Sequence, residues 1–224
     1  MKVKWLSALP MIFAVMLIAL PSWAGTQLWD FEKAAQEKEW EVANGQWQIK
    51  NGVYQETSGA EPAMHSIIGE ENWDDYTVQG KVRMDQGNWA GLLFRAQSEF
   101  EYYIYYMNVP DNKSELWKHN PGAFDARNNI TQIPAVGKLK IANNEWFDFK
   151  VVVEGDQFQL WINDELQSED QDNSYKTGKI GIWAWQTEAS FDDITVTGDN
   201  VKHTLAVEAR NKLAITWGKL KQTD

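Results

Sequence analysis

The run WFDFKVVVEGDQFQLWIN, residues 146–163, decides the fold class. Every second residue from Phe147 to Val153 is apolar, and most of the residues between them are polar. Gly155 and Asp156 then mark a turn, after which the alternation resumes from Phe158 to Ile162. A period of two is the signature of a β-strand with one buried face. The run therefore predicts two antiparallel strands joined by a tight turn.

The same pattern extends over most of the chain. Asn51-Gly52 stands between two short alternating runs within residues 45–54, which is a strong hairpin signal. Further strands are predicted over residues 76–84, 90–97, 101–109, 178–185 and 190–197. Many short strands with little helical periodicity indicate an all-β fold, a two-sheet antiparallel jelly-roll sandwich. Residues 111–136 are the least regular stretch and are predicted to form a loop over one end or face, where function often lies.

The start of the chain has the features of an export signal. Lys2 and Lys4 precede an apolar stretch from Leu6 to Leu20, and Ser22-Trp23-Ala24 is a small-x-small cleavage site. The sequence therefore predicts a signal peptide over residues 1–24, cleaved after Ala24, and a secreted or periplasmic protein. An uncleaved membrane anchor is the alternative, although the apolar stretch is short for a membrane span.

The predicted β domain covers residues 25–198, and residues 199–224 differ from it in kind. This tail is basic, and its apolar residues recur at helical spacing. Two interpretations stay open for it. The tail either docks on the domain or is disordered, or it forms a helix that binds a surface or a partner.

Composition excludes several classes of function. The chain has 21 basic and 32 acidic residues, and loss of Lys2 and Lys4 with the signal peptide takes the net charge from −11 to −13. An acidic chain does not suit nucleic acid, but it suits neutral glycans and divalent cations. The chain contains no Cys and only three His, at positions 65, 119 and 203, which leaves zinc and Cys/His nucleophile chemistry poorly supported. The sequence does not indicate an oligomeric state.

Thirteen Trp residues point toward sugars. Flat indole rings bury much area at a small entropic cost and match the apolar faces of sugar rings, although most Trp in a β-sandwich belong to the core. Trp183 and Trp185 share one face of their predicted strand. Trp89 lies at a turn, and Trp117 lies in the first part of the irregular stretch. Trp89, Trp117 and Trp185 are the predicted stacking residues.

Arg95 and Tyr103 complete the predicted carbohydrate site. Arg95 lies in the apolar run Gly91–Ala96, where a guanidinium needs a partner because an unpaired buried charge is costly. It either pairs with a core carboxylate or grips sugar hydroxyls or an acidic sugar. Alternation places Tyr103 and Tyr105 on one face of the next strand and Tyr102 and Tyr106 on the other, so that one pair is core and the other displayed.

Acidic residues near the two ends of the β domain suggest a cation. Asp30 and Glu32 lie near its start, and Asp192 and Asp193 lie near its last strand. Because the termini of a sandwich are often neighbours, these carboxylates would form a structural calcium site. The alternative is that they are ordinary turn residues.

Several short motifs resemble the concanavalin A-like lectin/glucanase superfamily. They are the hairpin of residues 44–54, the strand of residues 90–96 followed by Tyr102-Tyr103, the run of residues 146–161, and residues 181–185 with 191–196. More narrowly, the chain is similar to the laminin G-like jelly rolls and to the 3-keto-disaccharide hydrolase domains over about residues 28–198. The resemblance implies a jelly roll that binds or processes glycans. The Glu-x-Asp-x-x-Glu pattern of family 16 glucanases is absent here, which counts against their retaining hydrolysis.

The leading hypothesis is therefore a carbohydrate-binding domain that recognises a glycan through aromatic stacking and polar groups. An enzyme that acts on glycosidic bonds, as a hydrolase or a lyase, is the first alternative, and no catalytic residue is assigned to it. A protein-binding adhesion domain is the second.

Overall fold

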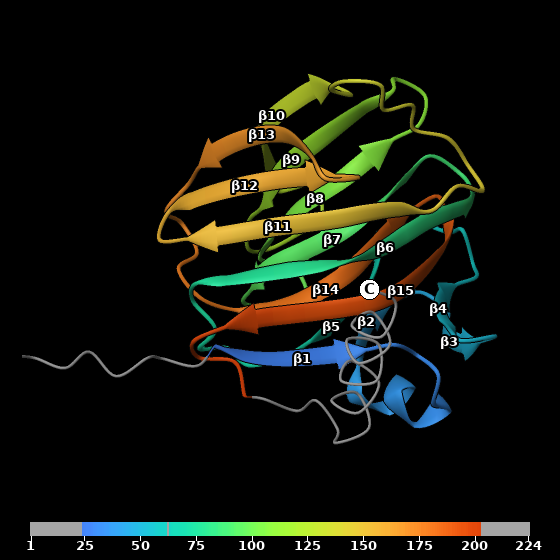
Figure 1. Ribbon diagram of the computed structural model, residues 1–224, viewed down its shortest axis with the longest axis horizontal. Helices are drawn as coiled ribbons and strands as arrows, with labels where there is room; N and C mark the ends of the chain where they lie inside the picture. The colour runs from blue at the N-terminus through green and yellow to red at the C-terminus, as the bar shows by residue number, and fades with distance from the viewer. Residues whose placement is uncertain (1–23, 62, 203–224) are drawn as a thin grey trace, which may run out of the picture.

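The computed structural model describes residues 24–61 and 63–202 (Figure 1). The predicted signal peptide except Ala24, and most of the predicted tail, residues 203–224, lie outside this range. The described chain folds into fifteen strands and one short 3-10 helix, η1 (Ala34–Glu39), which confirms the predicted all-β class. In the part of the chain that the structure describes, no helix has the length and apolar character needed to cross a membrane.

Eight strands form the first sheet, hereafter the eight-stranded sheet. Seven of them are hydrogen-bonded in the order β13-β12-β11-β6-β15-β4-β3, and β1 pairs with β15 beside β4. Their bounds are β13 (Glu165–Gln171), β12 (Gln157–Ile162), β11 (Phe147–Glu154), β6 (Tyr76–Gln86), β15 (Glu188–Gly198), β4 (Val53–Glu56), β3 (Trp47–Lys50) and β1 (Gly25–Trp29).

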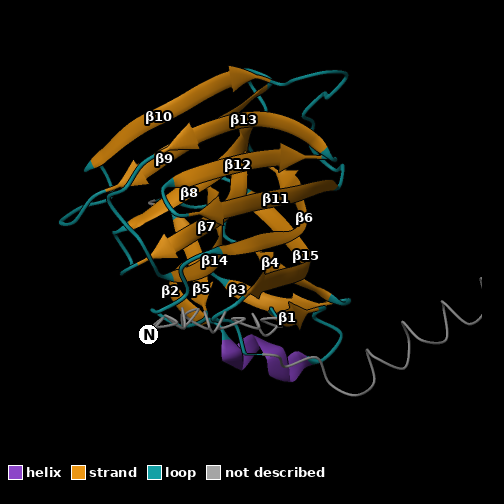
Figure 2. Ribbon diagram, turned by 60° about the vertical axis from the view of Figure 1, so that its left-hand side comes forward, coloured by secondary structure: helices purple, strands orange, loops and turns teal. Residues whose placement is uncertain are grey.

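The other seven strands form the second sheet, hereafter the seven-stranded sheet. Their order is β10-β9-β8-β7-β14-β5-β2, and every pair in both sheets is antiparallel. Their bounds are β10 (Arg127–Pro134), β9 (Lys113–His119), β8 (Tyr102–Asn108), β7 (Trp89–Ala96), β14 (Lys179–Trp185), β5 (Met64–Ile68) and β2 (Glu41–Asn44). The two sheets lie face to face as the layers of a jelly-roll sandwich (Figures 1 and 2).

The core lies between the sheets and follows the predicted alternation. On β11, Phe147, Phe149, Val151 and Val153 are buried, whereas the residues between them are partly or fully exposed. Strands β7, β8 and β14 supply the opposite wall of the core from every second residue. The hydrophobic effect, at roughly 25 cal/mol per Å² of buried apolar area, therefore specifies which face of each strand turns inward.

The first and last strands of the domain are neighbours, as the sequence predicted. β1 pairs with β15 from Gly25↔Gly198 to Trp29↔Ile194. The helix η1 follows β1 and lies beside β3 at the same edge of the sandwich (Figure 2). Glu37 of this helix accepts a hydrogen bond from the Ile49 amide over 2.9 Å, and Glu39 accepts one from the Trp29 indole over 2.9 Å.

The stretch 111–136 is more regular than its sequence suggests. We predicted a loop there, but the structure forms β9 and β10, which are paired from Arg127↔His119 to Pro134↔Lys113. Strand β10 is at the edge of its sheet, and none of its residues is buried. An edge strand without a fully buried residue has little hydrophobic alternation, so the periodicity on which the prediction relied is missing there.

Candidate functional site

Aromatic side chains cover the outer face of the seven-stranded sheet. On β14, Trp183 and Trp185 point outward, and Ile182 and Ala184 point into the core. On β8, Tyr102 and Tyr106 point outward, and Tyr103 and Tyr105 point inward. The predicted assignment of faces is thus confirmed on both strands. The outward pair is not displayed, however: Tyr102 is 0% and Tyr106 9% exposed, because His119 and Trp183 stack on them. We call this surface the aromatic face, and it consists of His65, Trp89, Tyr102, Tyr106, Trp117, His119, Phe124, Trp183 and Trp185.

The aromatic face has a buried layer and a more accessible layer. Trp183 is 2% exposed and stacks on Tyr106, with 5.1 Å between the ring centroids. Trp89 and Trp185 are only partly buried and stack on each other at 4.6 Å, with 28° between their planes. They are opposite each other in the β7–β14 register, so that strand pairing alone brings the two indoles together. The accessible layer is therefore a rigid pair of flat rings.

The hydroxyl of Thr187 fixes the ends of the two strands that carry this pair. It accepts hydrogen bonds from the backbone amides of Asn88 and Trp89, both over 2.9 Å, and donates one to the Trp185 carbonyl over 2.7 Å. Thr187 itself is fully buried. One side chain thus joins the backbone of both stacked tryptophans.

Arg127 brings a positive charge to the aromatic face. Its guanidinium carbon lies 4.9 Å from the Phe124 ring centroid, 5.4 Å from that of Trp117 and 5.7 Å from that of Trp185. Cations are attracted to the faces of aromatic rings, and guanidinium groups also stack on them. Arg127 begins the edge strand β10, and it therefore contributes hydrogen-bond donors at the rim of the face.

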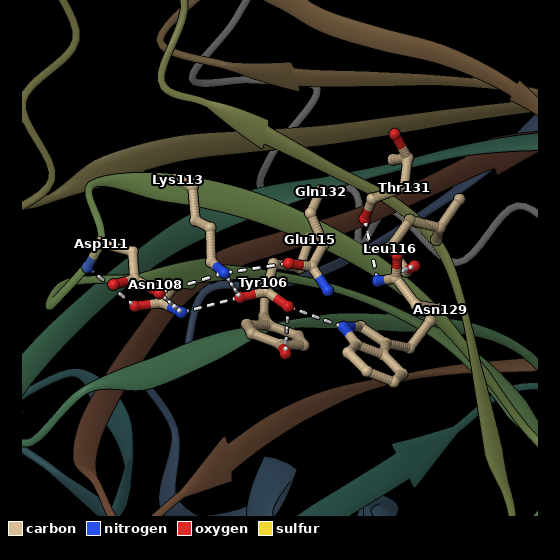
Figure 3. A network of polar contacts seen from close by, with 10 residues as sticks. Tyr106, Asn108, Asp111, Lys113, Glu115, Leu116, Asn129, Thr131 and Gln132 are labelled. Carbon is tan, nitrogen blue, oxygen red and sulfur yellow. Dashed lines mark hydrogen bonds and ion pairs between the residues drawn. The ribbon is translucent and has the colours of Figure 1, made fainter.

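Glu115 organises the polar side of the aromatic face (Figure 3). One carboxylate oxygen accepts from the Asn108 amide over 2.7 Å and lies 3.3 Å from the Lys113 ammonium. The other accepts from the Tyr106 hydroxyl over 2.9 Å and the Trp117 indole over 2.8 Å. Burial opposes the charge of Glu115, but these hydrogen bonds outweigh it and lower the pKa of the carboxyl below its ordinary value. Glu115 is therefore an ionised positioning group, and its occupied oxygens do not suit it to proton transfer.

Two neutral histidines form the floor of the face. His119 stacks on Tyr102 with 4.6 Å between the ring centroids, and His65 packs against the same Tyr102 ring with 5.3 Å between the centroids. Burial lowers the pKa of His65 to about 4, and burial together with the charge of Arg127 lowers that of His119 to about 3. Both imidazoles are uncharged at neutral pH. The buried Nδ1 of His119 has no hydrogen-bond partner within residues 24–61 and 63–202.

The structure brings three of the five predicted sugar-binding residues together. Trp89, Trp117 and Trp185 all belong to the aromatic face. Tyr103 does not, because it is buried between the sheets, where its hydroxyl donates to Asp172 and its ring stacks on Phe94.

Arg95 also lies away from the aromatic face. It is 1% exposed, its guanidinium donates to the carbonyls of Tyr175 over 3.0 Å and Asp74 over 3.2 Å, and it lies 3.6 Å from the Asp75 carboxylate. Its backbone has φ +49°, at the point where the β7–β14 register shifts. Arg95 was predicted to need a partner, and its main partners are these backbone carbonyls at one end of the sandwich.

The four predicted calcium ligands lie near the paired first and last strands. Burial and the negative charges of Asp193 and Glu32 raise the pKa of Asp192, and Asp193 binds the Lys81 ammonium over 2.5 Å. Among the described residues, no group of three or more His, Asp or Glu side chains is placed to hold a metal ion. Calcium therefore stays a prediction. If the ion binds, EDTA lowers the melting temperature, and an unchanged melt contradicts it.

Sequence reasoning missed Arg127, Glu115 and Thr187. The first two lie in the stretch that was predicted to be a loop, and their roles depend on the pairing of β8, β9 and β10. Alternation in Lys113–Trp117 would have placed Glu115 and Trp117 on one face, which is the signal that was available. Thr187 carries no signal of its own, because its partners come from two strands.

The two antiparallel sheets and their strand order define a jelly-roll domain. A family model described as the 3-keto-alpha-glucoside-1,2-lyase-like domain matches residues 23–197, and the chain belongs to this family.

Individual relatives include binding and catalytic proteins. Levanase from Bacillus subtilis (strain 168) is 27% identical over 132 residues, which are 58% of this chain and 19% of levanase, so the chain spans about a fifth of that enzyme. The carbohydrate-binding module CBM66 from Bacillus subtilis superposes with a TM-score of 0.63 at 21% identity, over 70% of this chain and 94% of the module. The catalytic domain of an endo-1,3-beta-glucanase from Thermotoga petrophila RKU-1 gives 0.56 at 9% identity, over 80% and 98%. The two structural matches share the fold.

Proposed function

We propose that this protein is an exported carbohydrate-binding domain that holds a glycan on the aromatic face. One observation carries the proposal: the partly exposed Trp89–Trp185 stack, with the Arg127 guanidinium 5.7 Å from the Trp185 ring. Flat rings match the apolar face of a sugar, and the nearby guanidinium supplies donors for its hydroxyls. The similarity to levanase and to the fold of CBM66 supports a glycan as the ligand.

The polar network gives this surface the orientation that sugar recognition requires. Glu115 restrains the Trp117 indole, and Thr187 joins the strand ends that carry Trp89 and Trp185. A site that is ordered before the ligand arrives loses less side-chain entropy on binding. The aromatic face therefore favours binding over a mechanism that needs large rearrangements.

The experiment is a glycan array on the mature chain, followed by titration of each positive polysaccharide into the wild type and Trp185→Ala. Loss of one stacking ring is expected to weaken binding about three- to tenfold, because a ring contact contributes about 0.5–1.5 kcal/mol. Trp185→Phe is the matched variant, since it keeps a flat ring and retains part of the affinity. Melting curves of both variants exclude unfolding as the cause. An unchanged affinity in Trp185→Ala would remove the aromatic face as the binding surface.

A second candidate function is a lyase or hydrolase step on a 3-keto-glucoside, which the family assignment favours. An elimination needs a group that accepts a proton. On the aromatic face, His119 is the group to test, because its Nδ1 has no hydrogen-bond partner among the described residues. Its burial and its pKa of about 3 make it a weak base, which counts against this second candidate. Release of sugar from a 3-keto-disaccharide by the wild type and its loss in His119→Ala would support the enzyme, and no release would favour binding alone.

Export and partner class are proposals of the same kind. The predicted cleavage after Ala24 is checked by the N-terminal sequence of the mature protein. A blank glycan array, together with retention of the chain on a protein partner, would favour the adhesion alternative.

A further inference from the structure

The outer face of the eight-stranded sheet contains two hollows that share one residue. The first, of about 560 Å³, is lined by residues that include Gln55, Lys81, Arg83 and Trp146. The second, of about 440 Å³, is lined by residues that include Lys81, Lys150 and Trp161. Lys81 lies in both linings, so the two hollows adjoin.

Together the hollows cross five neighbouring strands, β12, β11, β6, β15 and β4. Strands in a sheet lie about 4.8 Å apart, so this path is roughly 19 Å long. A surface of this length and shallowness matches an extended chain better than one small molecule.

Each hollow contains one indole ring with a cation on it. The Arg83 guanidinium carbon lies 4.6 Å from the Trp146 ring centroid, and Trp146 is 37% exposed. The Lys150 ammonium lies 4.2 Å from the Trp161 centroid, and Trp161 is partly buried. A cation over one side of a ring restrains it and leaves the other side for a ligand. The rings are therefore held for contact outside the core.

The polar groups along the path favour an uncharged ligand rich in hydroxyls. Lys81 pairs with Asp193, and Arg83 pairs with Asp85 over 2.5 Å. The linings also contain Lys150 and three more carboxylates, those of Asp148, Asp164 and Asp192, so the surface does not favour an anionic ligand. Gln55, Gln79 and Thr195 add amide and hydroxyl groups that donate and accept hydrogen bonds. Flat rings between such groups are what a neutral sugar chain contacts.

We propose that this surface is a second carbohydrate-binding site, which holds an extended neutral glycan across β12, β11, β6, β15 and β4. It is on the opposite side of the sandwich from the aromatic face. A long polysaccharide that reaches both faces, or two chains held by one domain, would then be bound with avidity.

Affinity electrophoresis of the mature chain through gels that contain soluble levan, laminarin or xylan tests this proposal. The double variant Trp146→Ala/Trp161→Ala is expected to lose about three- to tenfold in apparent affinity for each polysaccharide that retards the wild type. Phe100→Ala is the matched control, because Phe100 is 38% exposed and lines neither hollow. Melting curves identify any variant that fails to fold.

Adding Trp185→Ala separates the two faces. If both bind, the double variant and Trp185→Ala each retain partial retardation, and the triple variant loses it. If only the outer face of the eight-stranded sheet binds, Trp185→Ala has no effect and the double variant has all of it, which leaves this proposal standing and overturns that of the aromatic face. Unchanged retardation of the folded double variant, or no retardation of the wild type by any of the three polysaccharides, overturns the second site.

Discussion

The two outer faces of the sandwich carry their aromatic residues in opposite ways. On the seven-stranded sheet the rings form a continuous layer, with a buried tier of Trp183 and Tyr106 and an accessible tier of Trp89 and Trp185. On the eight-stranded sheet Trp146 and Trp161 lie in separate hollows, each beside a cation. The outer face of the seven-stranded sheet therefore resembles a second hydrophobic core. The outer face of the eight-stranded sheet is solvent-exposed and carries two separate indole rings. The same residue type should therefore contribute very differently to stability on the two faces.

The largest effect is expected for Trp183→Ala. Removing a large buried ring costs about 3–5 kcal/mol, because the cavity does not fully collapse. Urea denaturation of this variant measures the loss, and a cost below about 1 kcal/mol would contradict a second core. Phe100→Ala, at an exposed ring, gives the baseline.

The second largest effect is the loss of folding stability at low pH, which the two buried histidines cause. His65 and His119 titrate near pH 6.5 in the unfolded chain, but the pKa is about 4 and about 3 in the folded one. Below pH 6.5 the unfolded chain therefore binds more protons than the folded chain. The stability contributed by the two neutral rings is complete above pH 6.5, and it is lost as the pH falls through the folded-state pKa values of about 4 and about 3. The loss is on the order of a few kcal/mol for each histidine and is larger for His119, whose pKa is lowered further.

His119→Phe isolates this acid effect on the aromatic face. A phenyl ring still stacks on Tyr102 but binds no proton, so the variant should lose less stability than the wild type between pH 7 and pH 4. Carboxylates titrate in both proteins and cancel in the difference. Parallel losses of stability in the two proteins would show that His119 does not contribute.

Glu115→Gln ranks third. The amide keeps one acceptor oxygen, but its NH2 group faces donors that need an acceptor, and a buried group without its partner costs about 1–3 kcal/mol. Binding should weaken as well, because Trp117 loses the carboxylate that restrains it. Glu70→Gln is the control, since the Glu70–Lys202 pair is exposed and contributes less than about 1 kcal/mol. Equal losses in the two variants would contradict the organising role of Glu115.

The part of this architecture that was predictable is the part set by local alternation. Phe147 to Val153 and the pair Trp183 and Trp185 have the faces that a period of two predicts, because each inward residue is specified by burial against one core. Alternation placed Trp185 on the outer face, whereas its stack with Trp89 depends on the pairing of β7 with β14. The faces of the β11 residues and of Trp183 and Trp185 needed no longer-range information.

The rest of the candidate site depends on contacts between strands distant in sequence. Arg127 reaches the aromatic rings because β10 pairs with β9, and β10 has no buried residue to reveal a strand. Arg95 was predicted to lie on a sheet face. Instead, its guanidinium donates to backbone carbonyls at the end of the sandwich, where the β7–β14 register shifts and the Arg95 backbone has φ +49°. Neither outcome is encoded in the spacing of nearby residues.

Thr187→Val sharpens the comparison within the aromatic face. Valine matches the shape of threonine but removes the hydroxyl, so the Asn88 and Trp89 amides lose their acceptor at a cost of about 1–2 kcal/mol. The near-ultraviolet circular dichroism of the tryptophans should change with it, because the Trp89–Trp185 stack loses its support. Thr187→Ser keeps the hydroxyl and should preserve both signals. A normal spectrum in Thr187→Val would show that strand pairing alone holds the stack.

The smallest effect on stability is expected for Trp146→Ala on the eight-stranded sheet. Trp146 is 37% exposed, and its contact with Arg83 is worth about 0.5–1 kcal/mol at such a site. Its melting temperature should therefore stay close to that of the wild type, while Trp183→Ala melts far lower. A loss as large as that of Trp183→Ala would mean that Trp146 supports the sheet, and the contrast between the two outer faces would then be wrong. A small loss means that Trp146 contributes little to the fold, as expected of a ring that is exposed for contact with a ligand.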